Sequence, residues 1–156
     1  MSFKANTSLN SLEVVHKGLL IGQVIFALVA SFLLFDNRLI PPFKEYDRIL
    51  QLHILSLSFG GFYIGTFYIL KRQVEQIKKR NLTAGEKFSS YRKACMMQWA
   101  LIEGPCLISI MCFLLVGNIS FLALAGTLMV LFALLAPTSL KIQLLLKLRE
   151  EDLANL

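Results

Sequence analysis

Glu103 is the residue of this sequence whose type and setting most favour chemistry. It is the only carboxylate inside the long apolar runs of the chain. It follows Lys93 by about ten residues, so at ~1.5 Å per helical residue it lies ~15 Å deep, near the middle of a bilayer. An ionised carboxylate at that depth costs about 2.5–3.5 kcal/mol on insertion scales. We therefore expect a neutral, hydrogen-bonded acid.

The residues after this acid predict a distorted helix. Gly104 and Pro105 follow Glu103 directly, and a proline in a helix cannot donate a hydrogen bond to the carbonyl four residues earlier. The carbonyl of Leu101 would be left free beside the carboxyl group. A carboxylate next to a broken helix is typical of an ion or proton site. A structural kink, with a protonated Glu103 tying helices together, is the equal alternative.

Small and polar residues are expected around Glu103. Counting the same distance inward along the other apolar runs gives four neighbours in depth, namely Ala27, Gly61, Gly126 and Thr127. Small residues leave room around a carboxyl group, and the Thr127 hydroxyl is a candidate hydrogen-bond partner. Gln98 could extend a polar path from Arg92 towards the acid. The predicted ion- or proton-binding set is thus Glu103, Thr127 and Gln98.

The elements that must position these residues are four long apolar runs. The chain of 156 residues is 56% hydrophobic and 17% charged, with a mean hydropathy of +0.63, whereas soluble domains are about 45–50% apolar and about 25% charged. A helix needs roughly 20 apolar residues to cross a bilayer. We predict an all-α integral membrane four-helix bundle, a single domain over 1–156, with spans about 18–35, 49–70, 94–117 and 119–136. An ordinary soluble enzyme, a disordered tail and a disulfide-stapled module are excluded.

The basic residues predict the orientation of the bundle. With four spans, both termini and the central loop share one side, and only three of the 16 basic residues, Arg38, Lys44 and Arg48, fall on the other. Basic residues favour the cytoplasmic side, so we expect both termini in the cytoplasm, in a bacterial inner membrane. The same bias accounts for the net charge of +6 without nucleic acid.

Capping signals place helix ends outside the membrane. Thr83 and Glu86 form a predicted capping box, so 72–93 should be a helical hairpin that extends spans two and three into the cytoplasm. Asn10 with Glu13 has similar spacing. Gly117-Asn118 predicts a tight turn between spans three and four. After Pro137, the leucine-rich stretch 138–156 carries Lys and Arg and predicts an amphipathic tail at the inner surface.

Other residue types favour packing over chemistry. Small residues at helical spacing favour close helix contact, and this set comprises Ser56, Gly60, Gly61, Gly65 and Gly126. The three cysteines lie in one run without a C-x-x-C pair and are expected to be reduced, structural thiols. His16 and His53 lie at opposite boundaries, too far apart in depth for one metal or haem. We expect no metal, no cofactor and interfacial histidines without function.

A resemblance adds to this interpretation. The segment from Gln98 through Glu103-Gly104-Pro105 to Leu115 resembles the ion-carrying helix of rotary ATPase proteolipids, the c-subunit family, in which one Glu lies mid-helix among Ala, Leu and Ile. Gly60-Gly61 and Gly65 are similar to their glycine-rich partner helix. The loop between the two helices is much longer here. The whole chain also resembles small uncharacterised bacterial four-span inner-membrane proteins, which implies topology but no activity.

Two functions are compatible with these residues. Small size, protruding helices and the absence of catalytic patterns favour a non-enzymatic accessory or assembly subunit that contacts lipid and other membrane proteins. The alternative is a proton- or cation-coupled carrier or channel, a homo-oligomer that uses Glu103. Such a carrier predicts a polar cavity that reaches Glu103 between Gly61 and Thr127.

Overall fold

The computed structural model describes residues 7–43, 48–79 and 83–146, and the regular structure in these ranges is helical throughout. The first element is α1 (Thr7–Phe35). A continuous rod follows, made of α2 (Arg48–Tyr63), a π-helical segment η1 (Ile64–Leu70) and α3 (Lys71–Lys79). The remaining elements are α4 (Ala84–Val116), α5 (Ile119–Leu134) and α6 (Ser139–Leu146).

Three helices are long and apolar enough to cross a membrane. These candidate spans are Leu9–Phe35, Leu52–Lys79 and Ala84–Val116. The fourth predicted span, 119–136, corresponds to α5, whose 16 residues cover only ~24 Å at ~1.5 Å per residue. It qualifies as a fourth span only together with α6, from which it is bent by 66°. The chain is thus an all-α protein with three to four candidate spans, in agreement with the predicted class.

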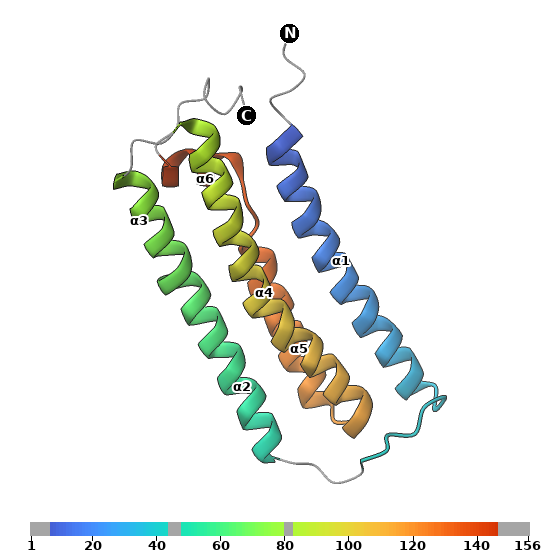
Figure 1. Cartoon of the computed structure of the whole chain (residues 1–156). Coiled ribbons are helices and arrows are strands. Elements are labelled where there is room, and N and C mark those ends of the chain that lie inside the picture. Colours follow the sequence, from blue (N-terminus) through green and yellow to red (C-terminus); the bar gives the residue numbers. More distant parts are fainter. Residues whose placement is uncertain (1–6, 44–47, 80–82, 147–156) are drawn as a thin grey trace.

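The central element of the bundle is α4. It packs against α1, against the α2–η1–α3 rod and against α5, while α1 and the rod lie on opposite sides of it (Figure 1). The start of α1, the end of α3, the start of α4 and α6 lie at the same end of the molecule, which we call the hairpin end (Figure 1). The core follows the buried side of α4, where Trp99, Ile102, Cys106, Ile110 and Phe113 are almost fully covered.

Helix ends follow their local sequence. The predicted capping box is confirmed, because the Glu86 N–H donates to Thr83 Oγ1 and the Thr83 N–H donates to Glu86 Oε2 at 2.9 Å. Gly117 ends α4 in the left-handed region with φ 73°, and Asn118 caps α5 through its side chain. A side chain at position 117 would also meet Pro41 at 2.7 Å. The tight turn is therefore confirmed.

One expectation about a helix start is wrong. The helix of the first span begins at Thr7, so Asn10 lies inside α1 and is not its cap. The helix of the third span continues through Gly104 and Pro105, so Pro105 does not divide it, and the kink at these residues stays a prediction. Continuity is possible because a proline removes only one helical hydrogen bond. Of the predicted amphipathic tail 138–156, residues 147–156 lie outside the described residues. In α6, Ile142 and Leu146 are buried against the bundle.

Candidate functional site

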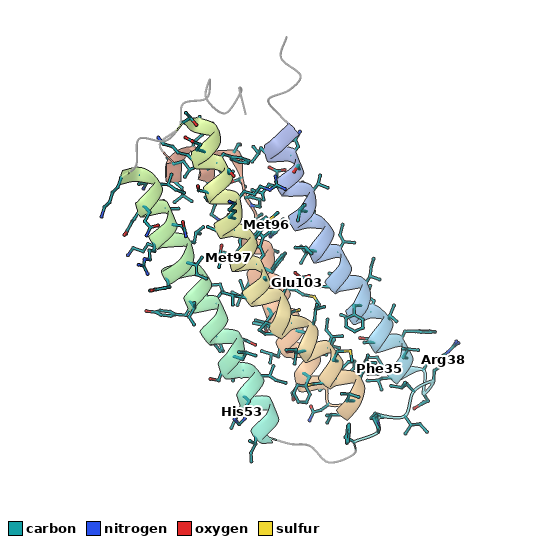
Figure 2. All side chains as sticks on the ribbon, viewed as in Figure 1. Phe35, Arg38, His53, Met96, Met97 and Glu103 are labelled. Carbon is teal, nitrogen blue, oxygen red and sulfur yellow. The ribbon has the colours of Figure 1, made fainter. Side chains whose placement is uncertain are left out.

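Glu103 lies at the edge of the uncovered side of α4. Its residue is half-buried. Trp99, about one helical turn earlier, packs against His16 of α1 with the ring centroids 4.9 Å apart and the rings tilted. Glu103 lies on the part of α4 that is turned towards α1 (Figure 2). Within the described residues, its carboxylate has no hydrogen-bond or ion-pair partner. The acid is therefore placed between the core and the exterior without a group to neutralise it.

A strip of α4 beside Glu103 is uncovered by the rest of the chain. We call it the open face of α4, and it comprises Met96, Met97, Ala100, Gly104, Ile108 and Met111. Met97 is 54% exposed, and a Cβ added at Gly104 would find no atom within 4 Å. Figure 2 shows Met96 and Met97 on α4 between α1 and the α2–η1–α3 rod. The open face is apolar. Its methionine side chains are flexible, and the small residues Ala100 and Gly104 leave a shallow depression between them.

The structure does not bring Thr127 to Glu103. The Thr127 hydroxyl donates to the carbonyl of Ala123 in its own helix at 2.9 Å. The residue lines a cavity of about 20 Å³ between α2 and α5, together with Ser58, Phe62 and Leu128. Glu103 is not among the residues around this cavity. The space expected between Gly61 and Thr127 is thus apolar and small, which counts against a polar path to the acid on that side.

Gln98 and the glycines show where α2 and η1 meet α4. A Cβ at Gly61 would lie 2.5 Å from the carbonyl oxygen of Leu101, and one at Gly65 would lie 3.2 Å from Gln98 Cγ. These two glycines therefore permit close contact with α4. Gly60 and Gly126 face open space instead, and Ser56 is exposed. Gln98 is buried and 2% exposed, on the side of α4 that faces η1.

His16 is part of a buried aromatic cluster, which sequence reasoning missed. The residue is 3% exposed. Its ring stacks on Phe132 of α5 at 4.6 Å and is tilted against Trp99 of α4. Its Nε2 lies 3.0 Å from the Phe132 carbonyl oxygen, and because a carbonyl only accepts, Nε2 carries the proton of this bond. The Trp99 N–H has no hydrogen-bond partner among the described residues.

Gln23 is a second buried polar group on the same face of α1. It is 1% exposed, and neither its amide nitrogen nor its amide oxygen has a partner in the described part of the chain. It lies seven residues after His16, just as Cys106 lies seven residues after Trp99. Because α1 and α4 run in the same direction (Figure 1), Gln23 is near the level of Cys106 and Glu103. The buried positions Leu12, His16, Gln23 and Ala30 follow one another at steps of four, seven and seven residues. This helical spacing is the signal that could have placed both polar residues inward.

The other titratable residues have local structural roles. His53 is exposed, and its Nδ1 lies 2.7 Å from the Ile49 carbonyl oxygen of its own helix. Cys95, Cys106 and Cys112 are buried free thiols, and the Cys106 thiol donates to the Ala125 carbonyl at 3.6 Å. No group of three or more potential metal-ligating side chains occurs among the described residues.

No protein-family model, curated protein or solved structure matches this chain.

Proposed function

We propose that this small integral membrane protein is a non-enzymatic accessory or assembly subunit, and that a transmembrane helix of another subunit docks on the open face of α4. The observation that carries the proposal is the position of Glu103. It borders an uncovered apolar surface in the third candidate span and has no partner within the described chain. In hydrocarbon such a carboxyl group is costly unless a neighbouring helix supplies a hydrogen-bond donor.

The shape of the open face supports a helix as the occupant. Ala100 and Gly104 are four residues apart, which is the spacing that lets two transmembrane helices approach closely. The methionines around them, Met96, Met97 and Met111, are side chains that adapt to irregular partners. A partner helix laid along this strip would cover Glu103 and the exposed methionines together.

A foreign helix fits the charge better than a second copy. Two copies related by an axis along the membrane normal would place Glu103 opposite Glu103, and two carboxylates at one site repel each other unless they share a proton. Apart from Glu103, the apolar run 94–117 contains no charged residue that could serve as a counterpart. We therefore expect the partner to contribute an amide, a hydroxyl or a cation at this depth.

The distribution of charge supports a location and an orientation. We place the chain in a bacterial inner membrane, with the hairpin end in the cytoplasm. Lys78 and Lys79 end α3, Lys87 lies near the start of α4, and Lys141 belongs to α6, and these elements meet at that end (Figure 1). A bias of this kind is the usual determinant of membrane orientation.

Matched glycine variants test the docking surface. Gly104 and Gly126 both face open space, so Gly104→Leu and Gly126→Leu should both fold. A side chain at 104 would block the open face, whereas one at 126 would project from α5. After gentle extraction from the native membrane, we expect Gly104→Leu to lose a copurifying protein that Gly126→Leu retains. Equal retention by both variants would contradict docking on α4.

Variants of the acid separate this function from the proton- or cation-carrier alternative. Glu103→Gln keeps a hydrogen-bonding side chain, while Glu103→Leu does not. Interhelical hydrogen bonds in membranes contribute about 1–2 kcal/mol, which is about 5- to 30-fold in binding. We expect Glu103→Leu to weaken binding of the partner by this factor, and Glu103→Gln to retain most of the wild-type affinity. Two results together would instead establish the carrier. The protein would be isolated as a defined homo-oligomer with no other protein, and Glu103→Gln would abolish a proton-linked phenotype.

A further inference from the structure

A cavity of about 270 Å³ lies at the hairpin end, between α1 and the bend that joins α5 to α6. Residues of α1 form one wall, and the bend forms the other. The residues that matter for its chemistry are Glu13, His16, Lys17, Leu20, Pro137 and Thr138. This cavity is separate from Glu103 and from the open face of α4.

The polar groups in and beside the cavity are mainly positively charged groups and hydrogen-bond donors. Lys17 Nζ lies 3.5 Å from Glu13 Oε2, and the lysine side chain is 70% exposed. Lys141 is close enough to act electrostatically on His16, as is Lys17. The Thr138 oxygen accepts from the Lys141 N–H at 3.4 Å, so its own proton remains available. Lys17 and Glu13 line the cavity, and Lys141 adjoins it, with its Nζ donating to the Leu134 carbonyl at 3.5 Å. Two lysines stand against one carboxylate, and this balance of charge favours an anion.

The other residues that line the cavity are apolar. They are Leu20, Ala133, Ala136 and Pro137. Ile21 is 58% exposed and Leu134 is 70% exposed, and both adjoin lining residues in the sequence. Along α1, charge ends at Lys17 and the apolar run to Phe35 begins. The site therefore combines a cationic mouth with a hydrocarbon wall, which matches an amphiphile.

We propose that this cavity binds the phosphate headgroup of an anionic phospholipid. Lys17 and Lys141 would contact the phosphate, Thr138 would donate to one of its oxygens, and the acyl chains would lie along Ile21 and Leu134. Basic pockets between transmembrane helices are suited to such headgroups, with about 1 kcal/mol for each lysine or arginine near the surface. Glu13 opposes the anion and limits its affinity.

Trp99 supplies a reporter for the test. It is the only tryptophan of the chain, and its ring lies 4.9 Å from His16, which lines the cavity. We would follow its emission while phosphatidylglycerol is added to the full-length protein in phosphatidylcholine nanodiscs, and separately while inorganic phosphate is added. We expect a saturable response to phosphatidylglycerol and none to phosphate at equal concentration.

Charge variants identify the site. Lys17→Gln and Lys141→Gln should each weaken the response about fivefold. Lys79→Gln, which removes an equal charge at the end of α3, should leave it unchanged. Glu13→Gln should tighten binding by a similar factor, a gain that misfolding could not produce. An equal response to inorganic phosphate would overturn the lipid assignment. Indifference to Lys17, Lys141 and Glu13 would overturn the site itself.

Discussion

The two sides of α4 differ in how completely the chain covers them. On the closed side, Trp99, Ile102 and Cys106 are at most 1% exposed, and glycine allows α2 to approach the α4 backbone. On the open face, Met97 is 54% exposed and Gly104 meets no neighbour within 4 Å. A helix that is apolar on both sides but packed on only one has a surface left for lipid or for another helix. The carboxyl group of Glu103 at the boundary favours another helix.

Truncation of the largest core side chain should show the greatest asymmetry. Trp99→Ala removes a buried ring that contacts His16 and lies 6.3 Å from the Phe132 ring, and substitutions of this kind cost about 3–5 kcal/mol. Met97→Ala, half a turn away on the open face, should change the free energy of unfolding by less than about 0.5 kcal/mol. Unfolding of the isolated protein in mixed detergent micelles measures both. Similar losses would mean that the open face is covered in the isolated chain.

Single methyl groups added to α2 should distinguish its side that contacts α4 from its side that does not. Gly61→Ala forces a Cβ to within 2.5 Å of the Leu101 carbonyl oxygen, and overpacking of this kind costs about 1–3 kcal/mol. Gly60→Ala, at the adjacent position, adds its methyl group to open space and should stabilise α2 by about 0.5–1 kcal/mol through helix propensity. The same micelle experiment gives both values. Destabilisation by Gly60→Ala would place an unseen contact on that side of α2.

The two buried glutamines should respond with opposite sign. Gln23 has no hydrogen-bond partner among the described residues, and an unpaired buried polar group costs about 1–3 kcal/mol. Gln23→Leu should therefore raise the stability of the isolated protein by about 1 kcal/mol. Gln98 is engaged with another group and packs against Gly65, so Gln98→Leu should lower it. A loss of stability in Gln23→Leu would indicate a partner or a bound water at Gln23.

Local signals in the sequence predicted more of the fold than of the site. The capping residues Thr83-Glu86 and Gly117-Asn118 determine helix ends through contacts within a few residues. The start and end of α4 and the start of α5 lie where these residues predict them. The apolar runs likewise identify the long helices. The side of α4 that stays open depends instead on which helices neighbour it, and span length alone gives no such information. A count of depth pairs Thr127 with Glu103, but depth says nothing about the direction of a side chain around its helix.

The inward position of His16 was also beyond a count of depth. A histidine at a membrane boundary is usually exposed to water, yet α1 begins at Thr7 and continues the same packing face through Leu12 and His16. The π-helical segment η1 had no recognisable signal in Ile64–Leu70. Both features arise from the fit between helices that are distant in sequence.

The capping box should give the smallest effect, and it should be confined to the start of α4. Glu86 is exposed, and hydrogen bonds from the Thr83 N–H and hydroxyl hold the pKa of its carboxyl below the ordinary value of 4.5. Because the folded pKa is the lower one, this carboxylate stabilises the folded hairpin above pH 4.5 and loses that contribution as the pH falls through the folded pKa. Amide hydrogen exchange at residues 84–87 should therefore accelerate, relative to the rest of α4, at acidic pH. Glu86→Gln keeps the cap geometry without a titrating group, so in this variant the relative exchange rates should not change with pH. A pH response that persists in Glu86→Gln would assign the titration to another group of the hairpin.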